Sequence, residues 1–275
     1  MTAALGLCAA LVALPRPPGV ASSTFLPEAE SFPSAAEAVT AFLGDATGVV
    51  AFGELHQTAR TSGIRSTLAR FTDEILPAIA PRASHLIVET WIASGHCGEP
   101  ERHVTAEVAR TTTRPPETEN EIVRLLRRAK ELGVAPHVLD VGCQEYQRLI
   151  GAGGEVDYDR LLTTTGEHLG RAIRQALALP RAAGRPLVIV YGGALHNDLH
   201  PGAATARYSF GPAIDELTNG AYREIDLYLP ALVAGLPALR AETWYSVWRR
   251  ARRRPGAVLI RRGPRSAVVL MSYPP

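Results

Sequence analysis

Apolar, β-branched runs alternate along this chain with longer segments of helical periodicity, and this alternation limits the possible folds more than any other feature. The runs at residues 85–90 (HLIVET) and 186–192 (PLVIVYG) are apolar almost without interruption. Such runs are typical of strands buried on both faces of a parallel sheet. Strands separated by long helices predict an α/β fold, with a mostly parallel central sheet flanked by helices.

The expected elements follow from the same periodicities. The predicted strands are 48–53, 85–90, 134–141, 186–192, 223–229, 257–261 and 266–272. The predicted helices are 35–43, 61–79, 117–132 and 158–179. Ser34 is a suitable N-cap for the first helix, and Gly133 a suitable end for the third. Gly263 and Pro264 are expected to join the last two strands as an antiparallel hairpin at the sheet edge.

Length and composition indicate one globular unit. The chain has 275 residues, of which 46% are hydrophobic and 20% charged, and this excludes disordered and collagen-like chains. We expect a single α/β domain over residues 34–275. No apolar run is long enough for a membrane-spanning bundle. The net charge of +2 is too small to indicate nucleic acid as a partner.

The first residues predict export. An apolar stretch at 3–14 is followed by small residues at 20–23, so residues 1–22 are expected to be a signal peptide, for a periplasmic or extracellular protein. No basic residue precedes the stretch, which a truncated start would explain. Lipidation at Cys8 is less favoured, because the bulky Leu7 precedes it. The alternative is a disordered apolar tail.

Removal of such a leader leaves two cysteines, Cys97 and Cys143. An even pair in an exported protein is expected to form a disulfide. Both follow predicted strands at equivalent offsets, so neighbouring strands would bring their loops together. Two unpaired thiols are the alternative.

Acidic residues and histidines follow four successive predicted strands. Glu54 and His56 follow the first, Glu89 ends the second, Asp140 ends the third, and His196 follows the fourth. Ligands of open parallel sheets bind outside the carboxyl ends of the strands. We therefore expect these side chains to form one functional cluster at that edge.

Two of these strand ends share the pattern Gly-x-x-His, as GELH at 53–56 and GALH at 193–196. A glycine would let the chain turn sharply out of the strand, so that the histidine three residues later points back over the sheet. His56, His196 and Glu89 would then supply the three ligands of a hydrolytic divalent-metal site with an open position for water. Glu54 is expected to act as the general base. His56 and His196 would take part in catalysis by holding the metal ion.

Paired GxxH motifs with a strand-end glutamate between them resemble the erythromycin esterase / ChaN-like / Tiki–TraB superfamily. The resemblance covers about residues 49–198 and rests on short motifs. It implies an α/β core with a site at the strand ends, and roles there for Glu54, His56, Glu89 and His196. The superfamily includes macrolide esterases, metal-dependent proteases and haem-binding lipoproteins. The chain has no room for a large helical insertion, which disfavours a macrolide substrate.

The sequence thus predicts an exported, metal-dependent hydrolase of an ester or amide bond in a small molecule or peptide. One alternative is a haem- or metal-binding protein without catalysis, with Tyr191 as a candidate ligand. The other is a metal-free hydrolase that uses Glu54 and His56 as an acid–base pair. Patterns such as GxSxG, HExxH, CxxC and GxGxxG are absent. Neither the substrate nor the oligomeric state follows from the sequence.

Four further features carry weaker expectations. Asp198 and His200 follow the second GxxH motif, and Arg65 could meet an anionic substrate. Residues 244–254 (WYSVWRRARRR) place two tryptophans on one helical face with arginines elsewhere. That segment would lie on an anionic membrane surface, cover a pocket, or pack its tryptophans on the core.

Overall fold

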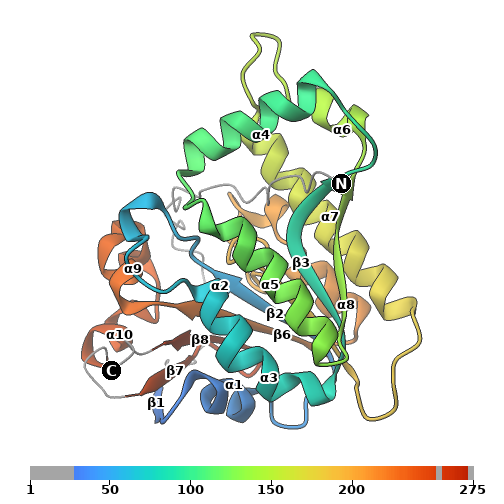
Figure 1. Ribbon diagram of the computed structural model, residues 1–275. Coiled ribbons are helices and arrows are strands. Elements are labelled where there is room, and N and C mark those ends of the chain that lie inside the picture. Colours follow the sequence, from blue (N-terminus) through green and yellow to red (C-terminus); the bar gives the residue numbers. More distant parts are fainter. Residues whose placement is uncertain (1–27, 252–255, 272–275) are drawn as a thin grey trace.

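The computed structural model describes residues 28–251 and 256–271. The expected signal peptide and Cys8 lie outside the described residues, as do the arginines at 252–254. Within the described residues, the strands form one eight-stranded sheet in the order β1-β7-β8-β6-β2-β5-β3-β4 (Figure 1). These strands are β1 (Ala29–Phe32), β2 (Gly48–Glu54), β3 (Ala83–Ala93), β4 (Ala135–Val141), β5 (Leu187–Gly193), β6 (Tyr222–Tyr228), β7 (Ala257–Arg261) and β8 (Ser266–Leu270).

The sheet is mostly parallel, with an antiparallel edge. Strands β8, β6, β2, β5, β3 and β4 pair in parallel, and β7 pairs antiparallel with β8. The predicted mostly parallel α/β fold with a C-terminal antiparallel hairpin is therefore confirmed. The outermost strand differs from the prediction, because β1 pairs antiparallel with β7 beyond the hairpin. Its four residues, AESF, are too short and too polar to show a strand pattern.

Helices cover both faces of the sheet. They are α1 (Ala35–Leu43), α2 (Thr67–Arg70), α3 (Leu76–Ile79), α4 (Glu99–Thr112), α5 (Glu117–Glu131), α6 (Cys143–Arg148), α7 (Tyr158–Ala178), α8 (Gly211–Leu217), α9 (Pro230–Gly235) and α10 (Tyr245–Ala251). Helices α1, α2, α3 and α5 pack on one face, which we call the α5 face. Helices α7 and α8 pack on the opposite face, the α7 face.

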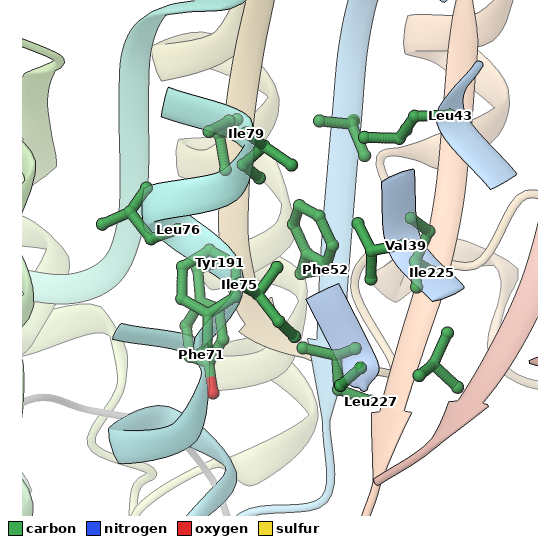
Figure 2. Packing of buried hydrophobic residues seen from close by; sticks show 14 of the residues in the cluster. Val39, Leu43, Phe52, Phe71, Ile75, Leu76, Ile79, Tyr191, Ile225 and Leu227 are labelled. Atoms are coloured by element: carbon green, nitrogen blue, oxygen red, sulfur yellow. The ribbon is translucent and has the colours of Figure 1, made fainter. Parts of the chain in front are cut away.

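The alternation of side chains along each strand supplies both cores. In β2, Val50 and Phe52 point into the α5 face, whereas Val49 and Ala51 point into the α7 face. On the α5 face, the rings of Phe71 and Tyr191 lie 4.5 Å apart (Figure 2). A strand that is apolar at every position thus has a separate core to fill on each side.

The predicted helix at 61–79 is broken in the structure. It begins at Thr67, where Ser66 Oγ accepts the Ala69 N–H, and it widens into a π-helical segment at Phe71–Ile75 before α3. Pro77 explains the widening, because it has no N–H for the preceding turn and its ring crowds the carbonyl of residue 73. Helix α4 was not predicted; its buried apolar positions are few, Val104 and Val108 among them.

The tryptophans of the arginine-rich segment lie inside the protein. Trp244 and Trp248 are buried and pack with residues of β7 and β8, among them Val258 and Val268. The apolar face of α10 is therefore covered by the protein core, and the described arginines are left at its outer side. Among the described residues, none of the helices has the length and apolarity needed to cross a membrane.

Candidate active site

The two GxxH motifs lie side by side at the carboxyl ends of β2 and β5. These strands pair in parallel, with Gly53 opposite Gly192 and Glu54 opposite Gly193. The register therefore sets the two motifs one residue out of step. The Ala194 N–H donates to the Glu54 carbonyl, 3.1 Å away, which continues the pairing into the second motif.

Both motif glycines serve close packing. A Cβ on Gly53 would lie 2.7 Å from Ala194 Cα and 2.5 Å from an Asp226 carboxylate oxygen. A Cβ on Gly193 would lie 2.8 Å from His56 Nε2. Each motif glycine is thus needed because the other motif approaches it. The expected sharp turn follows Gly193, where the His196 N–H donates to the Gly193 carbonyl over 3.0 Å, and neither motif glycine has a positive φ.

Glu54, His56 and Tyr191 form a buried hydrogen-bonded chain. His56 Nδ1 lies 2.8 Å from Glu54 Oε1, and the Tyr191 hydroxyl donates to Glu54 Oε2 over 2.5 Å. The side chains of Glu54 and His56 are each 8% exposed. A carboxylate that accepts from Nδ1 fixes the tautomer whose lone pair is on Nε2. Within the described residues, His56 Nε2 has no hydrogen-bond partner.

Glu89 and His196 form a second carboxylate–imidazole pair. Glu89 Oε2 accepts the Gly193 N–H over 2.6 Å, and Glu89 Oε1 lies 3.8 Å from His196 Nε2. The other ring nitrogen, His196 Nδ1, lies 2.9 Å from the Tyr208 carbonyl and must carry the proton for that bond. His196 Nε2 is therefore left as the ring atom that faces Glu89.

The two pairs approach the strand ends from the two faces of the sheet. Glu54 and His56 lie on the α5 face, beside Tyr191. His196 lies on the α7 face, where a Cβ on Gly166 of α7 would be 3.6 Å from its Nδ1. The structure thus brings all four predicted residues to one edge, and it divides them into two pairs. In the part of the chain that the structure describes, no set of three His, Cys, Asp or Glu side chains has the spacing of a metal site.

Burial sets the proton affinities of this site. Burial, and after it the positive charge of Arg114, lowers the pKa of His56 below its usual value, although Glu54 acts in the opposite direction. His56 is therefore neutral at pH 7, as a general base must be. Burial also raises the pKa of Tyr191 well above its usual value, so Tyr191 stays a hydrogen-bond donor to Glu54.

A small, partly open cavity borders Glu54. Its lining residues are Glu54, Gln57, Ser66, Leu68, Arg114, Thr118 and Glu121. Arg114 and Glu121 were not predicted. They follow no strand, and they reach the site because α5 packs against α2 and the Ala59 N–H donates to the Thr113 carbonyl.

The remaining candidates lie outside this cluster. Asp140 is exposed and accepts a hydrogen bond from Ser94. Asp198 is buried and accepts the His200 N–H over 2.9 Å, which shapes the turn after the second motif. Arg65 is 43% exposed and pairs with Asp73 and Glu74, so its charge is already matched within the protein.

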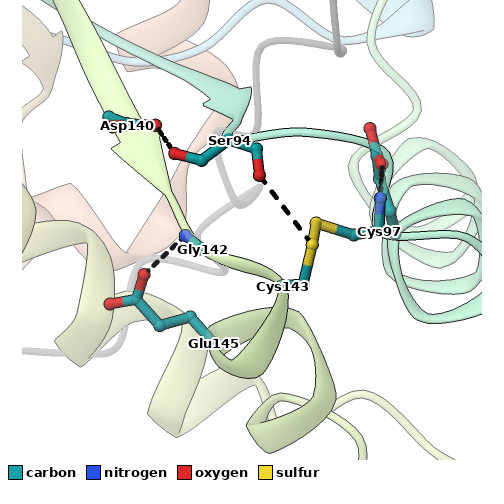
Figure 3. Close-up of a disulfide and its surroundings, with 7 residues drawn as sticks. Ser94, Cys97, Asp140, Gly142, Cys143 and Glu145 are labelled. Carbon is teal, nitrogen blue, oxygen red and sulfur yellow. Dashed lines mark hydrogen bonds between the residues drawn. A yellow bond between two sulfur atoms is a disulfide. The ribbon is translucent and has the colours of Figure 1, made fainter.

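Cys97 and Cys143 are joined by a disulfide in the structure, with their Cα atoms 4.9 Å apart. Cys97 precedes α4 and Cys143 begins α6, so the bond links the loops after the neighbouring strands β3 and β4 (Figure 3). Beside the disulfide, the Ser94 hydroxyl in the loop after β3 donates to Asp140, which lies near the end of β4.

Comparison with known proteins gives no family. No family model matches the chain, and no curated protein matches it. Two solved structures resemble part of it. One is RRSP, a MARTX toxin effector domain from Vibrio vulnificus CMCP6, which is 18% identical in sequence. The match covers 62% of this chain and 33% of that chain, with a TM-score of 0.32. The other is a structure of bacterial protein toxins, which is 16% identical in sequence. The match covers 76% of this chain and 37% of that chain, with a TM-score of 0.33. The chain thus spans about a third of the length of each.

Proposed function

We propose that this protein is an exported hydrolase that cleaves an ester or amide bond by acid–base catalysis, with His56 as the general base. The observation that carries the proposal is the state of the His56 ring. Its Nδ1 is held by Glu54, which is held in turn by Tyr191, and its Nε2 has no hydrogen-bond partner among the described residues. A neutral imidazole oriented by a buried carboxylate is suited to take a proton from water.

The proton transfers can be assigned atom by atom. His56 Nε2 takes a proton from a water molecule, whose oxygen attacks the carbonyl carbon of the substrate. The protonated form of His196, stabilised by Glu89 at 3.8 Å, then gives its Nε2 proton to the leaving oxygen or nitrogen as the bond to carbon breaks. Both oxygens of Glu54 already have partners, so we assign Glu54 to orienting His56 instead of to abstracting the proton.

Metal dependence is the main competing mechanism. The 3.8 Å between Glu89 Oε1 and His196 Nε2 is a spacing that two ligands of one ion also show. The superfamily suggested by the GxxH motifs remains a prediction, as do a bound divalent ion and a haem.

Hydrolysis of a panel of activated esters and short peptides, before and after exhaustive chelation, tests the proposal. We expect chelated protein to keep its rate. His56→Gln should lower kcat/KM at least about 100-fold, the lower end for loss of a general base, and Glu54→Gln should lower it too. His96→Gln, at an exposed histidine, is the matched control and should leave the rate unchanged.

Two results would overturn the proposal. One is a rate that disappears on chelation and returns with a divalent ion, which would establish the metal mechanism. The other is a His56→Gln variant that hydrolyses the panel at the parent rate. An absorption band of haem in the purified protein would instead establish the binding-protein alternative.

A further inference from the structure

Arg114 is the most unusual charged residue of the site. Its Nε and Nη2 are buried, and neither has a hydrogen-bond partner among the residues that the structure describes. An arginine is charged at every physiological pH, so it cannot relieve this by losing a proton. A buried donor without a partner costs about 1–3 kcal/mol, and more when it is charged. Such a cost is expected where a ligand completes the hydrogen bonds.

The backbone holds Arg114 in place for this purpose. The preceding residue, Thr113, ends α4 in the left-handed region at φ 47°, and its carbonyl accepts the Ala59 N–H over 2.7 Å. Two prolines follow, and they restrict Arg114 to extended conformations before α5 begins. A strained residue and fixed neighbours are what a preorganised binding residue requires.

The groups around Arg114 leave its charge available. Glu54 directs its two oxygens to His56 and Tyr191. Glu121 Oε2 accepts the Ser66 hydroxyl over 2.6 Å. These residues line one small, partly open cavity together with Arg114. The empty hydrogen-bonding positions of Arg114 are therefore beside the catalytic pair.

We propose that Arg114 binds a carboxylate of the substrate, so that the hydrolase acts on esters or amides that carry a free carboxylate near the scissile bond. Nε and Nη2 form one edge of the guanidinium, and this edge matches the two oxygens of a carboxylate. The inference rests on the proposed hydrolase and adds its substrate class.

A carboxylate fits this position better than a phosphate. Glu54 and Glu121 line the same cavity, so a dianion would meet more repulsion than a monoanion. Burial, and Glu54 nearby, raise the pKa of Glu121, although the Ser66 hydrogen bond acts against them. A Glu121 carboxyl in its neutral form would donate a hydrogen bond to an incoming carboxylate.

The test uses formate as the smallest carboxylate and measures its affinity for the full chain by calorimetry and by the ¹⁵N signals of arginine Nε. No turnover is needed, so the result is independent of whether the hydrolase proposal holds. We expect saturable binding that Arg114→Gln weakens at least tenfold. Arg114→Lys, which keeps the charge and loses the two-pronged edge, should weaken it as well.

Arg128→Gln is the matched control, because Arg128 is 41% exposed on α5 and pairs only at the surface with Glu131. It should bind formate like the parent, and inorganic phosphate should bind more weakly than formate in every variant that binds formate. In buffer without small anions, the melting temperature of Arg114→Gln should equal or exceed that of the parent, since two buried donors without partners among the described residues are removed. Equal formate affinity in the parent and Arg114→Gln, tighter binding of phosphate, or no binding by the parent would overturn the inference.

Discussion

At the scale of single residues, space decides the site as much as charge does. Gly193 has no side chain, and a Cβ there would lie only 2.8 Å from His56 Nε2. Gly192 is similar, since a Cβ there would lie 2.4 Å from Glu89 Oε2. The two carboxylate–imidazole pairs therefore approach the strand ends only because β5 ends in two glycines.

Gly193→Ala tests this packing. The added methyl would lie 2.8 Å from His56 Nε2, a distance that real side chains do not show, so the imidazole must move away from its position. We expect kcat/KM on the ester panel to fall at least about tenfold, since a misplacement of 1 Å can cost about 100-fold in rate.

Gly63→Ala serves as the control for Gly193→Ala. Gly63 lies in the loop before α2, and a Cβ there would meet no atom within 4 Å. This variant should keep the parent rate. A Gly193→Ala enzyme with the parent rate would show that the position of His56 Nε2 does not matter for the reaction.

At the scale of elements, the amino ends of β3 and β4 hold an ionisable pair far from the site. His85 Nδ1 and His137 Nε2 lie 3.0 Å apart, and burial lowers the pKa of each below its usual value. One neutral ring must donate its proton to the other for this bond to form. Two imidazolium rings at this distance would repel each other, so the pair stabilises the strand pairing only while it is not doubly protonated.

The pH dependence of stability follows from these shifts. A histidine with a lowered pKa in the folded state binds its proton more readily when unfolded, so acid favours unfolding. We expect the contribution of this histidine pair to the free energy of unfolding to be constant above pH 6.5. Below pH 6.5 the free energy of unfolding should fall as the pH drops. His137→Gln removes one of the two protonatable rings. The slope of the free energy of unfolding against pH should therefore decrease by an amount that corresponds to at most one proton, as measured by urea titrations between pH 5 and 8. An unchanged slope would assign the acid sensitivity to other groups.

At the scale of the whole molecule, the disulfide ties together the loops that follow β3 and β4. It closes a loop between residues separated by 46 positions in the sequence, and the chain-entropy model gives about 4 kcal/mol for such a loop. These loops also lead into α4, which ends beside Arg114. The disulfide therefore restrains the part of the chain that carries the proposed carboxylate subsite.

Removal of the disulfide should lower stability without removing the site. For a Cys97→Ser/Cys143→Ser double variant we expect a loss of free energy of unfolding of up to about 4 kcal/mol in denaturant titrations. The parent protein in reductant should show a similar loss, and thiol counting should find two more free thiols there than without reductant. Equal stability of the parent with and without reductant, or free thiols in protein recovered from an oxidising compartment, would contradict the bond.

The buried network under the second motif shows where sequence patterns lose their predictive power. Glu224 and Asp226 in β6 both pair with Arg262, and Asn197 donates to Asp226. These residues are far apart in the sequence, and each alone would be expected at the surface. Their pairing depends on β6 lying beside β8 and under the turn after β5, which no local pattern specifies.

Local patterns were sufficient for most elements and for the histidines at the strand ends. Apolar runs predicted the seven strands β2 to β8, and the Ser34 N-cap and the helical period predicted α1, because these features depend on neighbouring residues alone. Strand β1, the π-helical segment before Pro77 and helix α4 escaped prediction, because tertiary packing outweighs their weak local signals.

The sequence by itself determined that acid–base side chains lie near the ends of strands in one mostly parallel sheet, although Glu89 lies inside β3, four residues before its end. Only the tertiary structure decided their partners, since the register of β2 against β5 and the two faces of the sheet set which atoms meet. It joined Glu54 to His56 and Tyr191, set Glu89 beside His196, and brought Arg114 from the α4–α5 connection to the same edge. Periodicity reports which residues share a strand end, whereas hydrogen bonds between side chains depend on distances of a few ångströms that only the packed chain defines.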